Sequence, residues 1–141
     1  MSNGLDVALM KDPLGEWRPE GGDRHTDIAF SNSEWGSFFF DTLKARLVSY
    51  IEDEGYENYD ARYQSAFKES LKDFPLLARI SEFYQDAAFA PDEIDQLEKE
   101  LNRAAKLQMT DDAKAFPDGM LLGGRMAREE KMGIRLFSSY R

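Results

Sequence analysis

The strongest constraint on the fold is an aromatic-rich helical pattern that begins at residue 31. Apolar side chains recur there at threes and fours, which places them on one broad face of an α-helix. They are Trp35, Phe38, Phe39, Leu43, Leu47, Tyr50 and Ile51. Ser31 and Glu34 have the spacing of a capping box, and Gly55 offers a left-handed stop. The pattern predicts a long core helix from Glu34 to Glu54.

Three shorter helical patterns follow along the chain. The first spans residues 60–73 and stops ahead of Pro75, which then opens a second, short helix. The third begins at Pro91, a favoured first helical position, and its narrow apolar stripe consists of Ile94, Leu97, Leu101 and Ala104. Asp95 and Lys99 have the spacing of a favourable i,i+4 ion pair on this helix.

A last helix is predicted over Asp118–Met132, weakened by Gly123 and Gly124 at about 1 kcal/mol each. Alternating polar and apolar residues predict two short strands, Asp27–Ser31 and Ile134–Ser139. We expect these strands to pair with each other or to share one small sheet.

These elements predict an α-dominated α+β fold. It would be a single domain of about four or five helices with a minor two-stranded β element, spanning residues 27–141. Residues 1–26 are rich in glycine, proline and charge, as in DPLGEWRPEGGDRHT, and we expect them to be irregular.

Composition excludes several classes of protein. With 141 residues and 42% hydrophobic residues the chain is long and apolar enough for one packed domain. It has no cysteine, so disulfides and thiolate ligands are excluded. No apolar run approaches the length of a membrane span, and the first residues lack a signal-peptide pattern. We therefore expect a cytoplasmic protein with no membrane contact.

Charge is unevenly distributed along the chain. The formal net charge is −9, made of −12 over residues 1–102 and +3 over residues 103–141. A surface this acidic repels phosphates, so nucleic acid is not an expected partner. The charge instead favours a basic protein partner.

Two sets of residues are candidates for catalysis or ligand binding. His25 is the only histidine, and a neighbouring aspartate such as Asp23 or Asp27 could orient it as a general base. In GGRMAR two glycines precede Arg125 and Arg128, which could hold a phosphate, although the P-loop ending is missing. A pocket near His25 and these arginines would indicate a small enzyme or ligand-binding domain.

No metal or other cofactor is expected. Counted from Asp53, a calcium loop would need an oxygen ligand at position 3 and glycine at position 6, which Gly55 and Asn58 do not supply. A single histidine cannot build a two-histidine zinc site.

The stretch EDEGYENYD, residues 52–60, is the favoured binding site. Its acids repel one another, so folding alone does not require them, and tyrosines are rigid contact residues at interfaces. The predicted partner-binding residues are Glu52, Asp53, Glu54, Tyr56, Glu57, Tyr59 and Asp60. A solvated turn between two helices remains the alternative interpretation.

A resemblance adds to this interpretation. The short strand, SNSEW at the start of the aromatic helix, and FPLLARISEFYQDAAFAPDEIDQLEKELNRA together resemble small acidic bacterial proteins, some of them immunity partners of secreted toxins. The resemblance covers residues 27–105 and implies a non-enzymatic cytosolic protein that binds and blocks a basic toxin or effector domain. It brings no catalytic residues.

Other functions remain open from the sequence. A phage-type inhibitor or DNA mimic would use the same acids in a phosphate-like row. A structural protein or homodimer would use residues 38–40 and the stripe of Leu97 and Leu101 as a self-interface.

Overall fold

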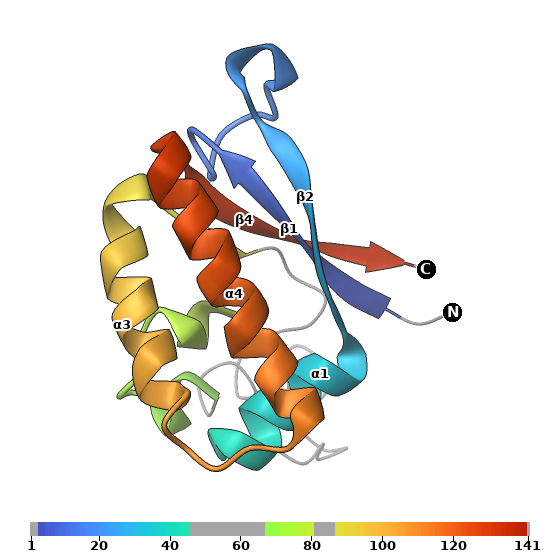
Figure 1. The fold of residues 1–141 in the computed structure, drawn as a ribbon, viewed down its shortest axis with the longest axis vertical. Helices are drawn as coiled ribbons and strands as arrows, with labels where there is room; N and C mark the ends of the chain where they lie inside the picture. Colours follow the sequence, from blue (N-terminus) through green and yellow to red (C-terminus); the bar gives the residue numbers. More distant parts are fainter. Residues whose placement is uncertain (1–2, 46–66, 81–86, 141) are drawn as a thin grey trace, which may run out of the picture.

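The sheet carries more strands than the sequence predicted. The computed structural model describes residues 3–45, 67–80 and 87–140. Within them, four strands form one antiparallel sheet in the order β2-β1-β4-β3 (Figure 1). The strands are β1 (Asn3–Met10), β2 (Arg24–Ser31), β3 (Ala87–Phe89) and β4 (Gly133–Tyr140). The expected minor two-stranded element is therefore wrong, and the two predicted strands are separated by β1.

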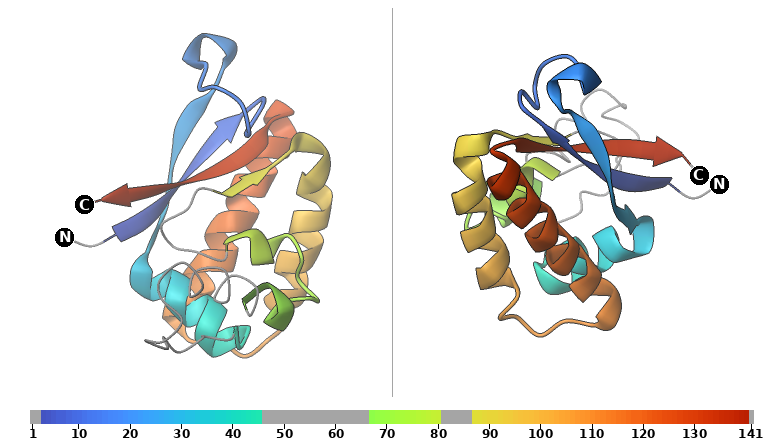
Figure 2. Two further views of the ribbon diagram at one scale, coloured as in Figure 1. Left: turned by 180° about the vertical axis from the view of Figure 1, so that it is seen from behind. Right: turned by 45° about the horizontal axis from the view of Figure 1, so that its top comes forward.

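The first 26 residues are not irregular throughout, because they contain β1, one of the two interior strands of the sheet. β1 pairs with β2 on one side and β4 on the other. Leu5, Val7 and Leu9 alternate along it and are fully buried in the core, as a strand of period two requires. The pairing of Asn3 with Tyr140 brings the two ends of the described chain side by side (Figure 2).

Helices cover one face of this sheet. They are α1 (Asn32–Gly36), α3 (Ile94–Ala104) and α4 (Asp111–Glu130), with α4 between the other two (Figures 1 and 2). Short helical turns complete the described elements: η1 (Pro19–Gly21), η2 (Ser37–Thr42), η4 (Leu77–Ile80) and η5 (Pro91–Glu93). Residues 67–70 are also helical, and the earlier part of the helix predicted over 60–73 lies outside the described residues.

The predicted start of the first helix is confirmed, but its predicted length is wrong. Ser31 Oγ accepts from the Glu34 amide at 3.1 Å, and the Glu34 carboxylate accepts from the Ser31 amide at 2.8 Å. After Gly36 the turns widen into the π-helix η2, and Lys44 then adopts a left-handed φ of 59°. Phe38 and Phe39 of η2 are fully buried, and Phe40 is partly buried and packs against the same core.

Replacing Ser31 with alanine removes half of the capping box. We expect the free energy of unfolding to fall by about 1 kcal/mol, because one amide at the start of α1 loses its acceptor. Urea unfolding measures the change. Asn32→Ala is the control, since Asn32 is exposed and follows the cap. Equal losses in both variants would show that the cap contributes nothing specific.

The stripe predicted on the third of the shorter helices is confirmed. α3 buries Ile94, Leu97, Leu101 and Ala104 against the core. Since Leu97 and Leu101 are fully buried within the chain, as are Phe38 and Phe39, these side chains are not available as the self-interface that the sequence left open.

The last helix is longer than predicted, and its glycines do not interrupt it. α4 begins after the N-cap Thr110, whose hydroxyl accepts from the Ala113 amide at 3.3 Å. Gly123 and Gly124 are buried inside it, where an added Cβ would lie 3.5 Å from Val7 and 3.2 Å from Glu98. The contact at Gly123 would be ordinary, and at Gly124 only the flexible Glu98 side chain would have to give, so the buried helix continues through both glycines.

Candidate functional site

The acidic stretch predicted as the binding site lies outside the described residues. Residues 52–60 fall between Ala45 and Phe67, the nearest described positions. Their role in partner binding therefore stays a prediction. The described residues contain the other sequence candidates, His25, Arg125 and Arg128, and two surface features that the sequence did not predict.

His25 lies on the face of the sheet that points away from α4. The preceding residue, Arg24, points to the helical side and its guanidinium bonds Glu130 of α4 at 2.6 Å. His25 itself stacks on Trp17, with ring centroids 4.7 Å apart, and lies 5.7 Å from Phe137. The histidine is thus part of an aromatic cluster on the outer face.

The aspartate beside His25 has a structural role. Asp23 is buried, and its carboxylate accepts from the backbone amides of Lys11 at 3.0 Å and Arg18 at 2.8 Å. These bonds close the long connection between β1 and β2. Both carboxylate oxygens are engaged by backbone amides, so Asp23 does not orient the histidine as a general base.

Arg125 and Arg128 do not share a pocket with His25. Both belong to α4, on the opposite side of the sheet. Arg128 reaches α3, where its guanidinium bonds Asp95 at 2.6 Å and Glu98 at 2.8 Å. The hydrogen bond to Asp95, and to a smaller extent the one to Glu98, raises the pKa of Arg128. The predicted pairing of Asp95 with Lys99 is therefore wrong, because the α4 arginine takes the carboxylate.

Glu100 is the most deeply buried charged residue in the described chain, with 1% of its surface exposed. Its carboxylate accepts from the amide of Leu76 at 3.0 and 3.2 Å, from that of Leu77 at 3.1 Å, and from Gln96 Nε2 at 3.1 Å. A side chain of α3 thus caps the start of η4. These bonds compensate the carboxylate for the water it loses.

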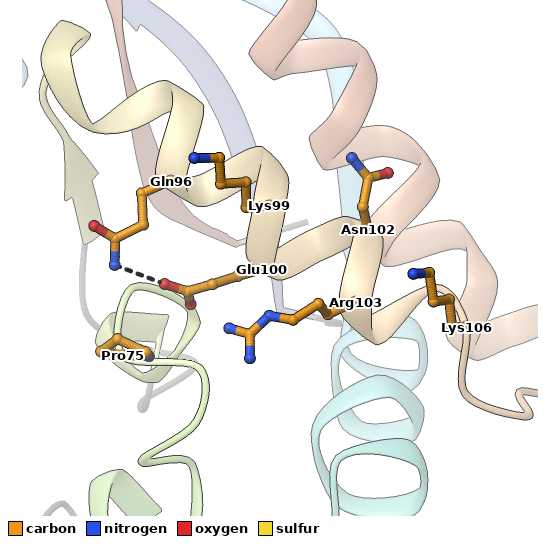
Figure 3. A pocket seen from close by; sticks show the side chains of 7 residues that line it. All are labelled: Pro75, Gln96, Lys99, Glu100, Asn102, Arg103 and Lys106. Atoms are coloured by element: carbon orange, nitrogen blue, oxygen red, sulfur yellow. Dashed lines mark hydrogen bonds between the residues drawn. The ribbon is translucent and has the colours of Figure 1, made fainter.

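A hollow of about 590 Å³ lies beside this buried carboxylate, between α3 and the segment around Pro75 (Figure 3). Its lining residues are Pro75, Gln96, Lys99, Glu100, Asn102, Arg103 and Lys106. Glu100 and Arg103 extend toward the Pro75 segment in this view. The lining is cationic in a chain whose net charge is −9.

Sequence reasoning missed this arrangement, although a signal was present. Glu100 precedes Leu101 and follows Leu97 by three positions, so it lies on the buried stripe of α3. A charged residue at a core-facing helical position is rarely buried without partners. The pattern alone did not show that those partners are the amides after Pro75.

A second feature of the described surface is a set of three exposed aspartates on two elements that contact each other, η2 and α4: Asp41, Asp111 and Asp112. Asp41 belongs to η2, and the other two begin α4, at the end of the molecule where α1 also lies (Figure 1). Ser33 of α1 donates to Asp112 at 2.8 Å. All three aspartates are exposed, and none forms an ion pair with another described residue.

Comparisons with known proteins do not assign a family. No family model matches the chain, and comparison with curated proteins and with solved structures gives no significant match. Among the described residues, no helix is both long and apolar enough to cross a membrane. In the same part of the chain, no cluster of three or more histidines and carboxylates is placed to hold a metal ion.

Proposed function

We propose that this protein is a non-enzymatic binding protein for a basic protein partner, an immunity-type inhibitor that covers the cationic cleft of a toxin or effector domain. The observation that carries the proposal is that Asp41, Asp111 and Asp112 are exposed and have no cationic partner among the described residues. The helix dipole accounts for Asp111 and Asp112 in the first turn of α4. It does not account for Asp41.

The sequence holds further acidic residues besides these three aspartates. The stretch that starts seven residues after Ala45 holds Glu52, Asp53, Glu54, Glu57 and Asp60 together with Tyr56 and Tyr59. Complementary charge accelerates the encounter between proteins, and desolvated tyrosines then supply contact energy. The resemblance to immunity partners supports the same role, and a cytoplasmic location belongs to the proposal.

Neutralising the acidic stretch is expected to abolish capture of the partner. The test variant is Glu52→Gln, Asp53→Asn, Glu54→Gln and Glu57→Gln, which changes the net charge from −9 to −5. Untagged wild type and variant are coupled to beads, exposed to native lysate at low and high salt, and the retained proteins quantified by mass spectrometry. We expect wild type to retain one basic protein that elutes with salt.

A charge-matched control separates the site from net charge. Glu16→Gln, Glu20→Gln, Glu69→Gln and Glu129→Gln produce the same net charge from exposed positions elsewhere. The proposal requires that this control keeps the partner and that the test variant loses it. Equal retention by all three proteins would overturn the assignment to residues 52–60.

A further inference from the structure

The hollow beside Glu100 is lined by three cations, two on α3 and one just after its end. Lys99 and Arg103 lie one turn apart on α3, and Lys106 follows two residues after its last residue, Ala104. Like charges at this spacing disfavour a helix. Their position near the C-terminal end of α3 is favourable for Arg103 and Lys106 through the helix dipole, but less so for Lys99.

The carboxylate in the hollow does not neutralise these cations. Glu100 is buried, and both of its oxygens are held by amides of Leu76 and Leu77 and by Gln96. These neutral donors stabilise the carboxylate without removing its charge, so the three cations of the lining exceed it by two positive charges. The excess of positive charge therefore remains available to a ligand.

Arg103 is held in place before any ligand arrives. Its Nη2 donates to the Asp73 carbonyl at 2.6 Å, and the guanidinium carbon lies 4.9 Å from the centre of the Phe74 ring. This carbonyl takes one N–H group of a guanidinium that carries five. The remaining donors form the fork that recognises phosphate, already ordered by two contacts.

Lys99 lacks the partner that its sequence position predicts. Asp95, one turn earlier, bonds Arg128 of α4 instead. Neither Lys99 nor Lys106 forms an ion pair within the described residues. Their flexible stems leave both ammonium groups able to move toward an anion beside Arg103.

We propose that this hollow binds the phosphate group of a small molecule. Arg103 supplies the oriented donors, and Lys99 and Lys106 supply the charge that a phosphate dianion needs. The volume of about 590 Å³ lies within the usual size of small-molecule sites, leaving room for an organic group against Pro75. This site is independent of the acidic stretch, so its test needs no protein partner.

The test is isothermal titration calorimetry with inorganic phosphate, AMP and adenosine, at constant ionic strength maintained with chloride. We expect saturable binding of phosphate and AMP and none of adenosine. Lys99→Gln with Lys106→Gln, and separately Arg103→Gln, should each weaken AMP binding roughly tenfold, the effect of losing a charge-assisted hydrogen bond.

The control is Lys114→Gln with Arg125→Gln, which removes two positive charges from exposed positions on α4. It should bind AMP as wild type does. Because Arg103→Gln also loses the bond to Asp73, the lysine variant keeps the test valid if that protein fails to fold. Absence of saturable phosphate binding by wild type, or equal weakening in control and lysine variants, would overturn the proposal.

Discussion

Glu100→Ala is expected to lower the free energy of unfolding by about 3 kcal/mol or more, because each buried donor left without an acceptor costs about 1–3 kcal/mol. The amides of Leu76 and Leu77 lose their acceptor together. The residue is only 1% exposed, so in the wild-type protein both amides rely on the carboxylate and not on bulk water. Urea unfolding followed by circular dichroism measures the loss.

Two further variants give this prediction its specificity. Glu100→Gln keeps one oxygen that can accept from both amides, as Oε1 does, so its cost should be about half that of alanine. Glu129→Ala, at an exposed position on α4, should change the stability by less than about 0.5 kcal/mol. A Glu100→Ala loss no larger than that of the Glu129 variant would contradict the capping role.

Gly119→Ala is expected to destabilise the protein by about 1–3 kcal/mol through overpacking. A Cβ at this position of α4 would lie 2.6 Å from the Phe30 ring and 3.3 Å from Ile28. Phe30 is 3% exposed and packs on Phe116 at 4.6 Å between ring centres. The ring therefore cannot move aside without disturbing the contact between α4 and β2.

The same substitution at Gly36 is the control, and its effect should have the opposite sign. Gly36 has helical backbone angles, and an added Cβ would lie 4.0 Å from the Phe40 ring, an ordinary contact. Alanine there should stabilise the protein by about 0.5–1 kcal/mol, because glycine loses more backbone freedom on folding. Thermal unfolding of both variants measures the difference, and destabilisation of equal size at both positions would refute the proposed close approach of α4 to β2.

The correct predictions from the sequence concern elements whose structure depends on a pattern within a few neighbouring residues. The capping box at Ser31, the stripe of α3 and the strand before Tyr140 each follow from spacing over a few residues. Interior strand β1 was missed, although Leu5, Val7 and Leu9 alternate, because the glycines and prolines that follow dominated the composition of the first 26 residues.

Tertiary contacts decided the remaining elements. Glycines weaken an isolated helix, yet Gly119 of α4 permits close packing on Phe30 of β2. Helical periodicity placed Phe38 and Phe39 together on the apolar face, but it did not reveal the widened turns of η2. The sequence did not identify Lys99 and Arg103 as candidate ligand-binding residues. That interpretation needs two tertiary contacts, the ion pair of Arg128 with Asp95 and the packing of the Pro75 segment beside α3.

The predicted grouping of His25 with Arg125 and Arg128 also failed because of tertiary structure. His25, Arg125 and Arg128 are residue types that suit catalysis, but the sheet separates the histidine from the two arginines. The predicted strand began only at Asp27, whereas β2 begins at Arg24 and turns Arg24 and His25 to opposite faces of the sheet, so the sequence could not show this separation.

The most direct test of electrostatic recognition is the association rate of the captured partner, measured by stopped-flow fluorescence over a range of salt concentrations. We predict that the rate falls roughly tenfold or more from low to high salt, because steering by opposite charges is screened. The variant neutralised at Glu52, Asp53, Glu54 and Glu57 should associate slowly at low salt and respond little to added salt. A wild-type rate that does not change with salt, or a variant that associates as fast as wild type, would contradict the proposal that residues 52–60 dock the partner.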